Sequence, residues 1–156
     1  VLFRSRRNSI EIVGVPETGN EDTEVIVVKV SEVVGKPLQS DDIEACHRVP
    51  STRRGPRPIV ARFSSRKKRD ALMTKAKGKK IKAKDLSNGT GFGDQEVYVN
   101  DHLTVENKKI LSAAKIQKRE INAKYVCVRN GNIFLRKDDG CPAIKITSMN
   151  QIQEIT

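Results

Sequence analysis

The stretch NSIEIVGV, Asn8–Val15, predicts a central β-strand and decides the fold. Ile10 and Ile12 would lie on one face of this strand and Glu11 and Val13 on the other, because successive side chains of an extended chain point to opposite sides. A proline and turn residues follow the stretch directly and end it. The pattern predicts an antiparallel sheet with helices on one face and an open opposite face.

Helix and strand patterns alternate downstream of this strand. A helix is predicted from Asn20, as its N-cap, to Gly35, although its many β-branched residues lower the helix propensity. A second helix is predicted after Ser64 or Ser65, with Leu72 on its buried face. Further strands are predicted at Asp42–Pro50, Pro58–Phe63 and Glu96–Asn100, and a long mobile loop at Lys77–Gln95. The order β-α-β-β-α-β predicts a ferredoxin-like, RRM-like α+β domain.

The pattern changes after Leu103 and predicts a smaller α+β domain. A helix would begin at Thr104, and Asn130-Gly131 between two alternating segments predicts a β-hairpin. A third short strand and a final helix that begins at Ser148 complete this domain. We therefore expect three parts, which are a fragment end (residues 1–7), an RRM-like domain (8–102) and a C-terminal domain (103–156).

Positive charge is concentrated in one quarter of the chain. The formal net charge of the 156 residues is +11. From Arg48 to Lys84 the sequence holds 15 Lys or Arg and a single acid, Asp70, whereas the remainder holds 15 basic and 18 acidic residues. Such asymmetry is typical of a surface that binds a polyanion, although a solvated, solubilising surface would have the same composition.

Catalysis and metal binding find little support in the sequence. His47 and His102 are the only histidines, and neither lies in a metal or nucleophile motif. Cys46 and His47 would point to opposite faces of a strand, which does not suit one metal ion. We expect no enzyme activity and no cofactor. Three widely spaced cysteines and the absence of an apolar span favour a reduced compartment, cytoplasmic or nuclear, and no membrane span.

Nucleic-acid binding is better supported, but not through base stacking on the first sheet. RNA-binding modules of this topology stack bases on aromatic residues of the first and third strands. At the outward positions of these strands this chain has Glu11, which would repel phosphate, and Val13, Val60 and Arg62. We expect a cationic groove that contacts backbone phosphates of a single strand, with Tyr98 as one stacking ring. The candidate residues are Arg48, Arg53, Arg54, Arg57, Arg62, Lys79, Lys80 and Tyr98 in the first domain, and Lys108, Lys109, Lys115 and Arg129 in the second.

Five segments resemble a known family in the same order and spacing. They are RRNSIEIVGVPE (6–17), CHRVP (46–50), RPIVARF (57–63), VYVNDHLT (97–104) and RNGNIFLRKDDGCPAIKI (129–146). The chain resembles the baculovirus few-polyhedra (FP) proteins and, through insect retroelements, the first-open-reading-frame proteins of LINE-type retrotransposons. The resemblance implies an RRM-like module and a small C-terminal domain that together hold single-stranded nucleic acid.

The resemblance also implies site residues and an oligomeric state. Arg62 matches a basic position on the family's third strand, whereas Tyr98 stands where the family has a second basic residue. An upstream coiled coil would make the full-length protein a homotrimer, and the present fragment would be monomeric.

Two functions of different classes therefore remain open. The first is a chaperone-like protein of a retrotransposon or virus-like element that binds single-stranded RNA or DNA. The alternative is a viral-type assembly module whose basic surface meets an acidic protein or an anionic membrane.

Overall fold

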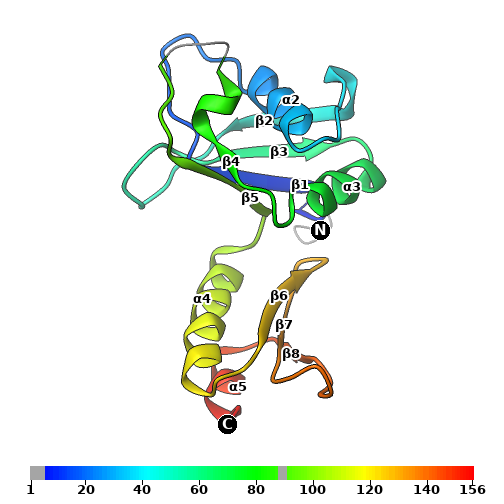
Figure 1. The fold of residues 1–156 in the computed structure, drawn as a ribbon, viewed down its shortest axis with the longest axis vertical. Coiled ribbons are helices and arrows are strands. Elements are labelled where there is room, and N and C mark those ends of the chain that lie inside the picture. Colours follow the sequence, from blue (N-terminus) through cyan, green and yellow to red (C-terminus); the bar gives the residue numbers. More distant parts are fainter. Residues whose placement is uncertain (1–5, 88–90) are drawn as a thin grey trace. The chain divides into compact units, whose positions relative to one another are not determined.

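The protein folds into two compact α+β units, residues 1–102 and residues 103–156 (Figure 1). The structure, a computed structural model, describes residues 6–87 and 91–156. Residues 1–5 of the predicted fragment end lie outside the described residues. Within the described ranges, no helix is both long and apolar enough to cross a membrane.

The first unit contains an antiparallel sheet with β1 near its centre, as predicted. Its strands are β1 (Ser9–Val13), β2 (Ile43–Arg48), β3 (Ile59–Phe63), β4 (Ile81–Lys82) and β5 (Glu96–Asp101). The spatial order is β2-β3-β1-β5-β4, and all neighbouring strands are antiparallel. Ile10 and Ile12 of β1 are fully buried, so the alternation of this strand does set the core face.

Two helices cover that core face, α2 (Thr23–Val33) and α3 (Arg66–Ala76). Val27 and Val30 of α2 and Leu72 of α3 belong to the same buried cluster as the two isoleucines of β1. Ser65 caps α3 as predicted, since its side chain accepts a hydrogen bond from the Lys68 amide.

The predicted start of the first helix was wrong by two residues. Asp22, and not Asn20, is the N-cap of α2, because its carboxylate accepts a hydrogen bond of 3.0 Å from the Glu24 amide. Asp and Asn are about equally good caps, so the sequence pattern could not separate these two positions.

The predicted loop at Lys77–Gln95 was wrong at its centre. Strand β4 pairs with β5 through Ile81 and Val97, and a 3₁₀ helix, η2 (Ala83–Leu86), follows it directly. A second 3₁₀ helix, η1 (Ser40–Asp42), precedes β2. Ile81, Ala83 and Leu86 are buried in the first core. These three apolar residues stand apart in a lysine-rich segment, too few to show a period.

The second unit packs two helices against one face of a three-stranded sheet. Its elements are α4 (Val105–Glu120), β6 (Tyr125–Arg129), β7 (Asn132–Arg136), β8 (Ile144–Ile146) and α5 (Met149–Glu154). The predicted caps Thr104 and Ser148 are confirmed. The predicted hairpin is confirmed as well, because Asn130 and Gly131 have φ of 52° and 76°, as a type I′ turn requires.

Candidate nucleic-acid interface

The fold neutralises about half of the basic segment with acids that are mostly distant in sequence. Eight of the 15 cations between Arg48 and Lys84 form ion pairs. The pairs are Arg48–Glu21, Arg57–Glu17, Arg62–Glu44, Arg66–Asp70, Lys68–Asp42, Arg69–Asp101, Lys82–Asp94 and Lys84–Asp94. The number of Lys and Arg residues in the basic segment is therefore larger than the number of positive charges that its surface presents without an acidic partner.

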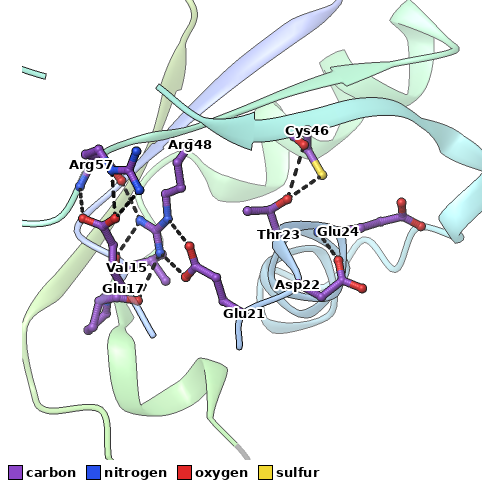
Figure 2. A network of polar contacts seen from close by, with 10 residues as sticks. Val15, Glu17, Glu21, Asp22, Thr23, Glu24, Cys46, Arg48 and Arg57 are labelled. Carbon is purple, nitrogen blue, oxygen red and sulfur yellow. Dashed lines mark hydrogen bonds and ion pairs between the residues drawn. The ribbon is translucent and has the colours of Figure 1, made fainter. Parts of the chain in front are cut away.

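Arg48 is a structural residue (Figure 2). Its side chain is 5% exposed and forms a two-pronged ion pair with Glu21, at 2.9 and 2.8 Å. The same guanidinium donates to the backbone carbonyls of Val15, Pro16 and Arg57. Every prong of the fork is used inside the protein. Arg48 therefore has no free N–H group with which to bind a ligand.

Arg57 closes the base of the loop between β2 and β3. Its guanidinium lies 2.7 Å from Glu17, and its backbone amide donates to the same carboxylate (Figure 2). These hydrogen bonds hold the pKa of the Glu17 carboxyl below its usual value. The amide of Val49 also donates to the carbonyl of Pro58, at 2.9 Å. The two ends of the loop are therefore fixed to each other and to the segment after β1.

The tip of this loop presents two arginines to solvent. Arg53 and Arg54 are both exposed, and neither forms an ion pair in the part of the chain that the structure describes. Gly55 beside them has φ of +105°, a conformation that glycine adopts readily. The tip therefore offers two uncompensated guanidinium groups on a loop whose base is fixed.

A second group of uncompensated cations extends along and beyond α3. These residues are exposed and make no ion pair within residues 6–87 and 91–156, and they are Lys67, Lys75, Lys77, Lys79 and Lys80. Lys79 donates one hydrogen bond, to the carbonyl of Val34.

Arg69 of the same helix is buried, although no local sequence pattern distinguishes it from its exposed neighbours. It is 6% exposed and binds Asp101 and the carbonyl of Ser9. Arg69 thus ties α3 to both β1 and β5, and its side chain, 7% exposed, presents little surface to a ligand.

The face of the first sheet opposite the helices is not strongly cationic. Arg62 is paired with Glu44 at 2.7 Å, and the Tyr98 hydroxyl donates to Glu96, which raises the pKa of the tyrosine. Glu11 in the middle of this face is only 6% exposed. Tyr98 itself is 52% exposed and remains available for stacking.

The predicted single groove is therefore divided. Arg62 and Tyr98 lie on the open face of the sheet, whereas α3 packs against the opposite face. Lys79 follows α3 after two residues and donates to the Val34 carbonyl at the end of α2, so it lies on the helix side of the sheet, apart from the two residues of the open face.

Several predicted cations of the second unit are exposed. Lys109 and Lys115 lie on the outer side of α4, Arg129 ends β6, and none of them forms an ion pair among the described residues. Lys108 is half-buried. This unit holds 10 basic and five acidic residues in positions 103–156, so a positive surface is a property of both units.

Cys46 and His47 are consecutive residues of β2, whereas His102, Cys127 and Cys141 lie in other segments of the chain. Among the described residues, no group of three or more His, Cys, Asp or Glu side chains is arranged to hold a metal ion. His102 lies 3.1 Å from Arg6, and Cys46 is half-buried against Thr23, where burial raises the pKa of its thiol (Figure 2).

Comparison with known families places the second unit. Residues 104–156 match the family model described as baculovirus FP protein domain 2. This match confirms the FP part of the expected resemblance over the C-terminal third of the chain, while the relation to retrotransposon proteins stays a prediction. No curated protein matches the chain.

Proposed function

We propose that this protein binds single-stranded nucleic acid, mainly through its backbone phosphates, as a chaperone-like component of a virus-like or retrotransposon element. The observation that carries the proposal is the set of seven exposed cations between Arg48 and Lys84 that form no ion pair within the described residues, 6–87 and 91–156. They form two groups, the loop-tip pair (Arg53 and Arg54) and the α3 group (Lys67, Lys75, Lys77, Lys79 and Lys80).

These cations suit phosphate contact better than sequence readout. Uncompensated Arg and Lys side chains attract phosphates and release counterions when they bind, whatever the base sequence. Cations that already hold an internal acid, such as Arg57 and Arg62, would first have to exchange that partner. The exposed Tyr98 adds one ring on which a base could stack.

We also assign the first unit to the ferredoxin-like, RRM-like class. The assignment is supported by the order β1-α2-β2-β3-α3-β5 and by the position of β1 between β3 and β5. The FP match of the second unit supports an origin in a virus-like element.

The proposal is tested by fluorescence anisotropy with labelled single-stranded RNA over a series of salt concentrations. If about five phosphates are contacted, log affinity falls with log salt at a slope of roughly −3.5, at about 0.7 per contact. Single-stranded DNA, duplex DNA and heparin serve as competitors. RNA and DNA arms separate the two nucleic acids, and heparin measures unspecific attraction to a polyanion.

A pair of matched double variants makes the test specific to the uncompensated cations. Arg53→Ala/Arg54→Ala removes two exposed cations without an acidic partner, and Lys82→Ala/Lys84→Ala removes two that share Asp94. We expect the first variant to reduce the magnitude of the salt slope by about 1.4 and the second to change it much less.

Equal effects of the two variants, together with equal competition by heparin and duplex, would refute single-strand binding. That result would favour the alternative, an assembly module whose basic surface meets an acidic protein or an anionic membrane.

A further inference from the structure

The sheet of the second unit has a core face and a face that its own helices leave uncovered. Val126, Val128, Ile133, Leu135 and Ile144 point into the second core, where α4 and α5 pack against them. Side chains alternate along a strand, so the intervening residues lie on the opposite face. We call this opposite face the β6–β8 platform, and its residues are Tyr125, Cys127, Arg129, Asn132, Phe134, Arg136 and Lys145.

The strand register places two aromatic rings next to each other on this platform. Phe134 of the central strand β7 lies directly between Cys127 of β6 and Lys145 of β8, and Tyr125 lies directly opposite Arg136. Tyr125 is therefore the diagonal neighbour of Phe134, roughly 7–8 Å away between Cα atoms, within reach of one bound strand.

Both rings retain surface that a ligand can contact. Tyr125 is 39% exposed, and Phe134 is partly exposed and absent from the second core. A large apolar ring in the middle of a sheet is normally buried, so Phe134 is not explained by packing of the core.

The charge of the platform suits a polyanion. Three of its seven side chains are cationic, Arg129, Arg136 and Lys145, and the strands β6, β7 and β8 contain no acidic residue. The guanidinium of Arg136 lies 4.7 Å from the centre of the Tyr125 ring. Asp139 binds the Tyr125 hydroxyl at 2.8 Å and also contacts Arg136 at 3.3 Å, so these two residues are held in place at one end of the platform.

The first unit lacks this combination. Its open sheet face contains one exposed ring, Tyr98, and the acids Glu11, Glu44 and Glu96 lie on or beside it. Single-strand binding by stacking uses aromatic rings within a positively charged surface. Asp139 lies beside one end of the β6–β8 platform, but the strands of the platform themselves contain no acid.

We infer that the β6–β8 platform is the base-stacking site of the protein, where Phe134 and Tyr125 stack bases, Arg129 and Lys145 contact the flanking phosphates, and Arg136 holds the Tyr125 ring in place. The inference rests on the proposed function. It adds which part of the nucleic acid each unit recognises. The cations of the first unit attract phosphates whether or not bases are present, whereas the platform recognises the bases themselves.

The test compares an oligothymidylate with an abasic oligomer of equal length, which has the same phosphates and no bases. Wild-type protein should bind the oligothymidylate at least about fivefold more tightly, since one stacked base contributes about that factor or more. Phe134→Leu, which keeps an apolar side chain of similar size, should remove most of this preference. Lys109→Ala, which removes an exposed cation outside the platform, should weaken binding of both oligomers by the same factor.

A spectroscopic measurement keeps the test decisive if Phe134→Leu fails to fold, as circular dichroism and thermal unfolding would reveal. The chain contains two tyrosines and no tryptophan, so a Tyr98→Phe variant emits from Tyr125 alone. Saturating oligothymidylate should quench this emission, and saturating abasic oligomer should leave it nearly unchanged.

The possible failures are distinguishable. Equal affinity for the two oligomers, with steep salt dependence and no quenching of Tyr125, would overturn the stacking site and leave phosphate binding intact. The absence of salt-dependent binding to either oligomer would overturn both the stacking site and the proposed function.

Discussion

Replacement of Arg48 by alanine should destabilise the first unit strongly. The substitution leaves Glu21, whose side chain is 16% exposed, without its partner and also removes three donors to backbone carbonyls. Loss of one member of a buried ion pair typically costs 3–5 kcal/mol. Because Glu21 keeps some contact with water, we expect a loss at the lower end, about 3 kcal/mol in the free energy of unfolding.

Urea denaturation followed by circular dichroism measures this loss directly. In thermal unfolding it corresponds to a fall in Tm of about 12–24 °C for a unit of this size. Arg57→Ala is the matched control, since it removes an arginine that pairs with Glu17 on the same segment but is 53% exposed, and exposed pairs contribute little. If Arg48→Ala and Arg57→Ala were equally stable, the assignment of Arg48 as a structural residue would be refuted.

The same substitution should change how stability depends on pH. Hydrogen bonding from Arg48 lowers the pKa of Glu21 from its ordinary value of 4.5. A carboxyl with a lowered pKa in the folded state contributes stability that is full above pH 4.5 and is lost as the pH falls through the folded pKa. The difference between wild type and Arg48→Ala should therefore narrow on acidification, without vanishing, because the hydrogen bonds to the three carbonyls do not titrate.

Three further results are expected. Gly14→Ala should lower the Tm of the first unit, because Gly14 has φ of +99° and an added Cβ would lie 2.4 Å from the Glu96 carbonyl oxygen. The strain corresponds to about 1–3 kcal/mol. An unchanged Tm would contradict the backbone conformation of Gly14. Gly131→Ala should destabilise the second unit by about 1 kcal/mol, measured by urea denaturation, because the hairpin turn requires positive φ there. Cys141 should react with a thiol reagent before Cys46, because Cys141 is exposed while burial raises the pKa of the Cys46 thiol; labelling followed by peptide mass spectrometry gives the order.

Local signals in the sequence were sufficient for most elements of the fold. The alternation around Ile10 gave the core face of β1, the hydroxyls of Ser65 and Thr104 gave helix starts, and Asn130-Gly131 gave a turn. Each of these signals depends only on residues close to one another in the sequence. The same reasoning failed at Ile81, whose strand of two residues is too short to produce a periodic pattern.

The candidate site was harder to predict because charge compensation depends on tertiary contacts. Arg48 and Arg69 look like any other cation in the basic segment, yet both are buried through partners 27 and 32 residues away, Glu21 and Asp101. The aromatic residues of the β6–β8 platform were also missed, although their alternation with apolar core residues is visible in the sequence.

The closed base of the loop between β2 and β3 affects how this protein can vary over evolution. The hydrogen bond from Val49 to Pro58 and the ion pair of Arg57 close the loop at its base. A change in the number of residues between Val49 and Arg57 therefore leaves the register of β2 and β3 unchanged. The entropic cost of a longer loop grows only slowly with its length. The β-sheet therefore places no constraint on insertions and deletions at Ser51–Pro56, and only ligand binding does. Related chains can differ in the length of this loop while they keep the same β-sheet.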